Sequence, residues 1–179
     1  MSADLGILIL RVVVGALMMG HGSQKLFGSF NGPGLDGFAG HLAKMGMRGE
    51  KFWALIAATS EFGGGLLFLL GFLNPLGQLA IIAVMLMAIA QVHWPKLWVT
   101  EGGMEYSLTL IAVSLAVALT GPGLYSMDVV LNTFLPMPGV LIIGLGAVVL
   151  GVVAAMASID REEIHEIPEQ EEEEDRRAA

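Results

Sequence analysis

Long apolar segments occupy most of this chain and constrain its fold more than any other feature. They run from about 5 to 20, 52 to 72, 76 to 92, 104 to 120 and 139 to 158. Each is long enough, or nearly so, to cross the roughly 30 Å apolar layer of a bilayer as an α-helix. Polar residues do not alternate with apolar ones, as the strands of a membrane β-barrel would require. The sequence therefore predicts an all-α, polytopic transmembrane helical bundle with five crossings.

Composition and length agree with this fold. Hydrophobic residues make up 55% of the 179 residues, more than a soluble domain of this size covers with polar surface. A single helical bundle accounts for all the apolar segments, so we expect one transmembrane domain over residues 1–158. Ten of the 17 acidic residues follow residue 159. Residues 159–179 are accordingly expected to form an acidic cytoplasmic tail.

Two further features give the bundle detail. Apolar residues recur every three or four positions between 35 and 46, which is typical of a short helix lying in the membrane interface. The second long segment contains the run Gly63, Gly64 and Gly65. Because glycine has no side chain, this run is expected to let a neighbouring helix approach closely.

Basic residues mark one side of the membrane. With five crossings, the N-terminus, the turn at Asn74 and the segment 121–138 share a side that carries no lysine or arginine. The other side takes every basic residue except Arg11, namely Lys25, Lys44, Arg48, Lys51, Lys96, Arg161, Arg176 and Arg177. By the positive-inside rule, we expect a cell-membrane protein with its N-terminus outside and its tail in the cytoplasm.

Several short blocks of the sequence resemble the DoxX family in their order along the chain. They are HGSQKLFG after the first apolar segment, EFGGGLLFLLG in the second, and HWPKLW, GGMEYSL and GPGLYSMD around the fourth. This family comprises small bacterial and archaeal membrane proteins, usually of four helices, some of them linked to quinone reduction with thiosulfate and to terminal oxidase assemblies. The resemblance implies a DoxX-like four-helix bundle, to which this chain adds a fifth transmembrane helix and an acidic tail.

Two ionisable residues lie deep inside apolar segments, Arg11 in the first and Glu61 in the second. An unpaired charge at that depth costs several kcal/mol, so each of them needs a partner. We expect the two to form an intramembrane ion pair. Such a pair either locks two helices together or relays protons, and the structural role is the commoner one.

A polar cluster is expected at the inner ends of the helices, where the predicted topology brings several segments to one face. Its candidate residues are His21, Gln24, Lys25, Gln91, His93 and Glu105. A histidine or lysine that donates to a carbonyl, beside an acid that exchanges protons, suits a quinone headgroup. Ordinary interfacial polarity would explain the same residues, and haem ligation by the two histidines is a weaker alternative.

Other chemistry finds less support in the sequence. The chain has no cysteine, which excludes thiolate nucleophiles, disulfides and iron–sulfur clusters held by cysteine. The spacings HxxxH and HExxH are absent, so we expect no metal site. We predict no resident cofactor, although a quinone is possible. We expect no nucleic-acid partner, because an acidic tail would repel nucleic acid.

Three functions fit these observations. The sequence favours an accessory or assembly subunit of a membrane redox (respiratory) complex, because few of its groups carry chemistry. The alternative is a quinone-handling membrane oxidoreductase subunit, which leaves open whether the chain is itself catalytic. A small-solute transporter is less supported, because broken helices and a polar path would then be expected. In the first two cases the expected partners are the lipid bilayer and other membrane subunits.

Overall fold

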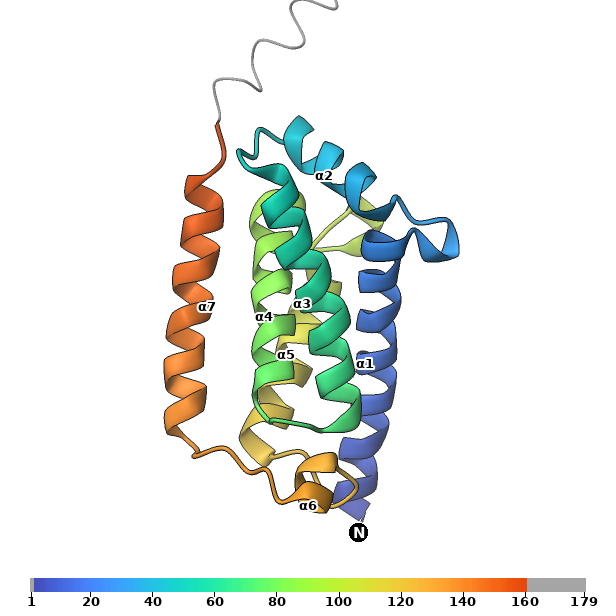
Figure 1. Cartoon of the computed structure of the whole chain (residues 1–179), viewed down its shortest axis with the longest axis vertical. Coiled ribbons are helices and arrows are strands. Elements are labelled where there is room, and N and C mark those ends of the chain that lie inside the picture. The colour runs from blue at the N-terminus through green and yellow to red at the C-terminus, as the bar shows by residue number, and fades with distance from the viewer. Residues whose placement is uncertain (1, 161–179) are drawn as a thin grey trace, which may run out of the picture.

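Antiparallel helices running between two ends of the molecule form this protein, as the computed structural model shows for residues 2–160 (Figure 1). The tail predicted at 159–179 lies outside the described residues from position 161 onward. The α-helices are α1 (Ser2–Phe27), α2 (Gly34–Lys44), α3 (Glu50–Leu70), α4 (Leu76–Ala88), α5 (Glu105–Thr120), α6 (Met127–Leu131) and α7 (Gly139–Ala157). A π-helical turn, Ile89–His93, extends α4, and short 3-10 turns cover Ser29–Asn31 and Val99–Glu101.

Within residues 2–160, four helices are long and apolar enough to cross a membrane: α1, α3, α7, and α4 with its π-helical extension to His93. The predicted all-α membrane bundle is confirmed. Helix α5 is apolar but has 16 residues, which gives it a length of about 24 Å. It packs against α4 and runs between the same two ends of the bundle (Figure 1). The fifth crossing therefore stays a prediction, and α5 is the helix on which it depends.

Helix α1 is longer than the sequence suggested. The predicted first span ended near residue 20, whereas the helix continues through the following glycine-rich stretch to Phe27. Gly22 lies in this extension, and a Cβ atom there would come within 2.4 Å of the backbone nitrogen of Phe62 in α3. Because glycine avoids that collision, α1 packs against α3 for two further turns. The extension also places Lys25 on the helix rather than in a loop.

The glycine run of α3 brings two different helices close. A Cβ atom on Gly65 would lie 2.8 Å from the backbone nitrogen of Met19 in α1, and one on Gly64 would lie 2.7 Å from the Cβ of Ala80 in α4. The expectation of close helix packing is thus confirmed at these two positions. At Gly63 it is wrong, because an added Cβ would have no neighbour within 4 Å. Helix α3 therefore lies between α1 and α4 at the centre of the bundle.

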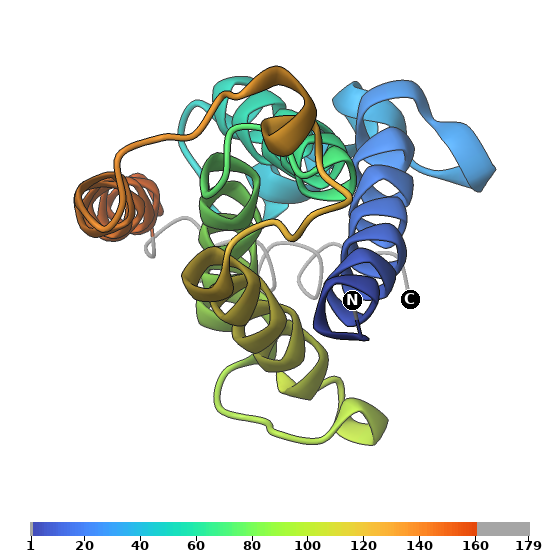
Figure 2. The same cartoon turned by 90° about the horizontal axis from the view of Figure 1, so that it is seen from below.

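Helix α7 stands beside the bundle and packs along α4 (Figures 1 and 2). It comes closest at Gly144, where an added Cβ would lie 2.2 Å from a methyl carbon of Leu79. At its far end, the backbone nitrogen of Arg48 donates to the carbonyl of Ser158 at 2.8 Å, and the side chains of Arg48 and Asp160 form a salt bridge. Helix α7 is thus attached to the loop between α2 and α3 as well as to α4.

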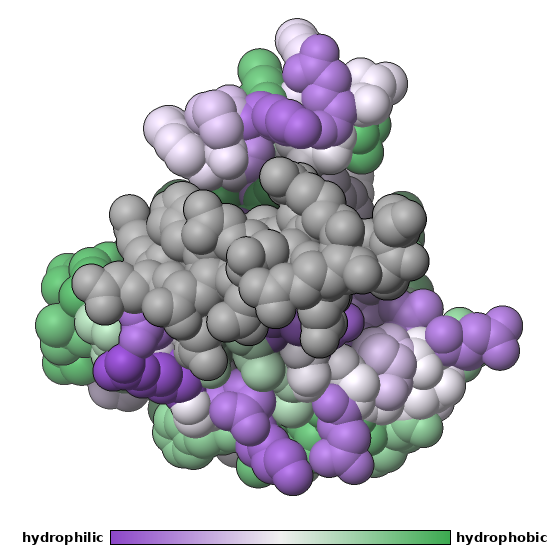
Figure 3. Space-filling view, turned by 90° about the horizontal axis from the view of Figure 1, so that it is seen from above, coloured by the Kyte–Doolittle hydropathy of each residue, from purple (hydrophilic) through white to green (hydrophobic). Residues whose placement is uncertain are grey.

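The basic residues described in the structure separate by end. Lys25, Lys44, Arg48, Lys51 and Lys96 all belong to segments at the end of the bundle that holds α2. Figure 3 looks onto this end and shows hydrophilic side chains on it. Arg11 lies toward the opposite end, inside α1. The charge asymmetry used to predict orientation is therefore present in the fold.

Arg11 joins three segments near the end of the bundle that holds the N-terminus. Its side chain is 2% exposed, and its guanidinium donates to four backbone carbonyls. These belong to Phe68 at 3.1 Å, Leu69 at 2.8 Å, Pro122 at 2.8 Å and Tyr125 at 2.9 Å. The first two lie in the last turn of α3, where the carbonyls point out of the helix end and the helix dipole favours a cation. Arg11 therefore closes this end of the bundle.

The predicted ion pair between Arg11 and Glu61 is wrong. The carbonyls that bind Arg11 lie about 11 Å farther along α3 than Glu61. Glu61 instead accepts from Lys25, with 2.5 Å between Nζ and Oε1. The prediction failed for two reasons. The extension of α1 brings Lys25 to the level of Glu61, and the carbonyls at the end of α3 lie nearer to Arg11 than Glu61 does.

Helix α6, which the sequence did not predict, holds the turn between α3 and α4. Its Asp128 is 1% exposed and accepts from the backbone nitrogens of Leu73 at 2.8 Å and Asn74 at 2.9 Å. The hydroxyl of Thr133 donates to the same carboxylate at 2.7 Å. One acidic side chain thus ties the segment after α5 to the α3–α4 turn.

Substitution of Arg11 by methionine is expected to destabilise the fold strongly. Four carbonyls, two of them in buried hydrogen bonds, would lose a charged donor, at a cost of about 3 kcal/mol or more. In a chain of this size, that cost lowers the midpoint of thermal unfolding by roughly 6–12 °C, measured in detergent. Arg11→Lys should recover little of it, because an ammonium group cannot reach four separated acceptors as a planar guanidinium does. An unchanged midpoint in Arg11→Met would contradict this role.

Candidate functional site

A cavity of about 850 Å³ lies in front of α4, between α3 and α7, with α2 at one end. Its volume is typical of sites that hold small organic ligands. Most of its wall is apolar, and α4 with its π-helical extension contributes one continuous face to it. The residues of that face are Leu76, Leu79, Ala80, Ala83, Val84, Met87, Ala88, Gln91 and Val92. The cavity exists because α7 packs on α4 and leaves space in front of α3.

An ion pair forms the polar part of this cavity. Lys25 from α1 and Glu61 from α3 both line it, with 2.5 Å between Nζ and Oε1. The Lys25 ammonium also lies 4.7 Å from the centre of the Phe38 ring, which favours a cation. The Glu61 side chain is 5% exposed and that of Lys25 is 27% exposed. The pair therefore reaches from the cavity toward the end of the bundle.

Two buried polar atoms in this cavity have no hydrogen-bond partner. They are Oε2 of Glu61 and Nε2 of Gln91. Leaving such an atom unpaired costs about 1–3 kcal/mol, so native proteins seldom bury one without a use for it. One atom is an acceptor and the other a donor. Together with the Lys25 ammonium, they suit a ligand that both accepts and donates hydrogen bonds.

The π-helical turn at the end of α4 contains Gln91. This turn covers Ile89–His93 and follows directly on the last regular turn of the helix. A π-turn inserts an additional residue and changes the direction of the side chains in it, and such turns occur frequently at functional sites. Here the turn carries a glutamine whose amide is buried in an otherwise apolar wall. No local sequence signal marks the turn.

Two of the predicted cluster residues order a loop instead. The Nδ1 atom of His93 is 2.7 Å from the carbonyl oxygen of Gly102, and Oε1 of Glu105 accepts from the backbone nitrogen of Val99 at 2.7 Å. Both contacts hold the connection between α4 and α5. Neither residue lines the cavity. Their role in the structure is to shape the connection.

The two remaining candidates lie on the extension of α1. The ring of His21 packs edge to face with that of Tyr106, with 6.3 Å between their centres. Gln24 lies against the returning loop, where a Cβ on Gly32 would come within 2.5 Å of the Gln24 backbone. Of the six predicted residues, only Lys25 and Gln91 therefore line the cavity, and Glu61 joins them.

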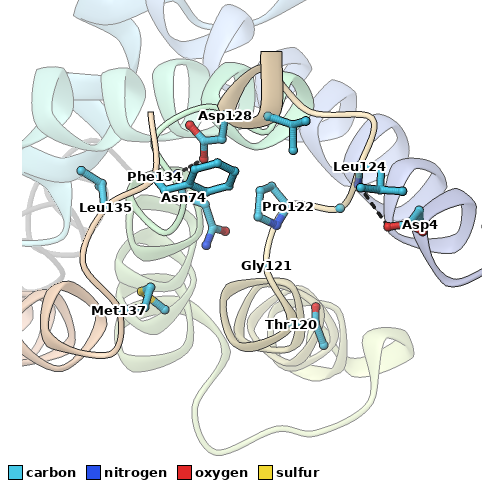
Figure 4. Close-up of a pocket in the computed structure, with 12 residues that line it drawn as sticks. Asp4, Asn74, Thr120, Gly121, Pro122, Leu124, Asp128, Phe134, Leu135 and Met137 are labelled. Carbon is cyan, nitrogen blue, oxygen red and sulfur yellow. Dashed lines mark hydrogen bonds between the residues drawn. The ribbon is translucent and has the colours of Figure 1, made fainter. Parts of the chain in front are cut away.

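A second cavity, of about 390 Å³, lies at the opposite end of the bundle (Figure 4). Asp4 and Asp128 line it, with Phe134 between α6 and α7. The Asp128 carboxylate already binds backbone amides, and Oδ1 of Asp4 accepts from the nitrogen of Leu124 at 3.1 Å. Its acidic groups are thus engaged in holding the fold. The cavity at Lys25, Glu61 and Gln91 is the better candidate.

Known proteins match the part of the chain that supplies this polar site. The DoxX family model matches residues 6–94, a range that includes Lys25, Glu61 and Gln91 and ends before α5 and α7. The inner membrane protein YqjF of Escherichia coli (strain K12) is 31% identical over 130 residues, which are 72% of this chain and 94% of that protein. No solved structure is significantly similar to the chain. With its apolar helices, the chain is a multi-pass membrane protein, and it belongs to the DoxX family.

Proposed function

We propose that this chain is a quinone-handling accessory subunit of a membrane redox complex, with the quinone headgroup held at Lys25, Glu61 and Gln91. The observation that carries the proposal is the pair of unpartnered polar atoms in the cavity, Glu61 Oε2 and Gln91 Nε2. In the reduced form, one hydroxyl would donate to Glu61 and the oxygen of the other would accept from the Gln91 amide; in the oxidised form a carbonyl would keep the bond from Gln91. Both buried atoms would then have partners.

The charge of the site supports a neutral headgroup. Lys25 is already paired with Glu61, so the two charges balance each other. A ligand with its own negative charge would lie against the free oxygen of Glu61, which like-charge repulsion disfavours. A quinone is uncharged and has two oxygens on an apolar ring. The apolar wall from α4 and α7 suits both that ring and an attached hydrocarbon chain.

Proton exchange follows from the position of the ion pair. When bound, a quinone supplies two-electron, two-proton chemistry that no side chain of this protein provides. Glu61 would exchange protons with the headgroup, and the partly exposed Lys25 links Glu61 to the polar end of the bundle. Because the chain has no cysteine, we propose that a partner subunit supplies the electrons. This division of roles supports an accessory subunit.

Gln91→Leu should weaken ligand binding without weakening the fold. The amide has no partner within the protein, so its loss leaves the thermal midpoint unchanged or raises it. Loss of one hydrogen bond to the ligand lowers affinity roughly five- to tenfold. Binding of a benzoquinone with a decyl chain is followed by quenching of tryptophan fluorescence, because Trp53 lines the cavity.

Ser114→Ala is the matched control for this variant. The Ser114 hydroxyl is also buried without a partner, but it lies in α5 and does not line the cavity. It should leave both stability and quinone affinity unchanged. Wild-type affinity in Gln91→Leu would count against the headgroup site.

The accessory role predicts that the chain is isolated with other subunits. Mild detergent extraction from native membranes, followed by mass determination and an absorption spectrum, should show an assembly whose other chains carry redox centres. In that assembly Gln91→Leu should slow quinone reduction while leaving the subunit composition intact. A chain that is isolated alone would refute the accessory role and leave the headgroup site to be judged by the binding assay.

The basic end of the bundle supports an orientation with the N-terminus outside and the C-terminal tail in the cytoplasm. The absence of native cysteine makes this directly measurable. In intact cells, a membrane-impermeant maleimide should label Val130→Cys, at the end that holds α6. Lys44→Cys, at the end that holds α2, should react only after the membrane is permeabilised. The reverse labelling pattern would show the opposite orientation.

A further inference from the structure

We propose that α7 supplies the binding wall for the apolar tail of the cavity's ligand, and that the small size of Gly151 determines which tails fit. This inference rests on the proposed headgroup site and extends it. Four small residues of α7 line the cavity at spacings of three and four, namely Gly144, Ala147, Gly151 and Ala155. At those spacings they occupy one face of the helix.

The same cavity holds the buried group that points to a ligand. Glu61 is 5% exposed on its side chain, and its Oε2 atom has no hydrogen-bond partner. Glu61 and the small residues of α7 line the same cavity. A ligand that satisfies Glu61 therefore has its remaining atoms against α4 and α7. Those atoms must be apolar, because most of the wall there is apolar.

The separation between α7 and α4 is uneven along the cavity. At Gly144 the helices touch, since an added Cβ would meet Leu79 at 2.2 Å. At Gly151 an added Cβ would have no atom within 4 Å, although this residue also lines the cavity. The two glycines lie about 10 Å apart along the helix. The open space beside Gly151 is therefore where a hydrocarbon chain has room.

The length of the cavity suits a chain rather than a compact molecule. Its wall on α4 and the π-helical extension runs from Leu76 to Val92, seventeen residues and about 24 Å along the helix axis. Its charged groups, Lys25 and Glu61, come from α1 and α3. We therefore assign the occupant as a lipid-soluble molecule with an uncharged polar head and an apolar tail. The tail wall lies outside residues 6–94, the range that matches the family.

The test compares two glycines of α7. Gly151→Leu fills the space beside the cavity, whereas Gly146→Leu adds the same side chain at a position that does not line the cavity and also has no atom within 4 Å. The probes are a methoxy-substituted benzoquinone with a decyl chain and the same ring without the chain. Gly151→Leu should weaken binding of the decyl probe by about tenfold or more, because the leucine side chain occupies the space that the tail needs.

The remaining measurements separate head from tail. Gly151→Leu should leave affinity for the tail-less ring at the wild-type value, Gly146→Leu should change neither affinity, and Gln91→Leu should weaken both probes, because both accept from its amide. Gly151→Ala, which adds one methyl group, should give a smaller loss for the decyl probe and guards against misfolding of the leucine variant. Thermal unfolding of every variant is measured alongside binding.

Each contrary result has a distinct meaning. Wild-type affinity of Gly151→Leu for the decyl probe would overturn the tail wall while leaving the headgroup site intact. Failure of the wild type to bind the tail-less ring would overturn the headgroup site. A phospholipid is the other possible occupant, and native mass spectrometry would detect it. A bound phospholipid that is lost in Gly151→Leu, and that quinone does not displace from the wild type, would overturn the assignment of an uncharged head.

Discussion

The close contact between α1 and α3 is the constraint on which the rest of the structure depends. A Cβ on Gly15 would lie 2.8 Å from the carbonyl oxygen of Gly65, and one on Gly22 would come still closer to the α3 backbone. These contacts fix how far one helix is shifted along the other. That shift places Arg11 at the last turn of α3 and Lys25 beside Glu61. Glycine at these positions thus determines both the closed end of the bundle and the polar part of the cavity.

The buried polar groups fall into two kinds. Arg11 has four carbonyl partners and Asp128 has amide and hydroxyl partners, so both are satisfied by the protein itself. Glu61 and Gln91 each keep one atom without a partner. This difference separates Arg11 and Asp128, which hold the fold, from the two groups in the cavity wall that we propose bind a ligand. The distinction rests on hydrogen bonding. Depth within the apolar segments does not reveal it, because Arg11 and Glu61 both lie deep in such a segment.

Sequence reasoning found the helices because a bilayer demands long apolar segments, and it found Lys25, Gln91 and Glu61 as polar residues within or beside them. It missed the pairing because arginine bound backbone carbonyls, which leave no mark in a sequence. Treating Gly22 as a helix-packing residue would have extended α1 and brought Lys25 toward Glu61. The cavity itself was beyond prediction, because it depends on the distance that α7 keeps from α3.

The carbonyl partners of Arg11 bear on how the chain enters the membrane. An arginine inside an isolated transmembrane helix opposes insertion by about 2.5–3.5 kcal/mol. Two of the four carbonyls that accept from Arg11, those of Pro122 and Tyr125, follow α5 in the chain. They are synthesised only after that helix. During synthesis, α1 is therefore short of partners until most of the bundle has emerged. We therefore expect stable insertion of α1 to be a late, collective event that couples residues 11 to 125 of the chain.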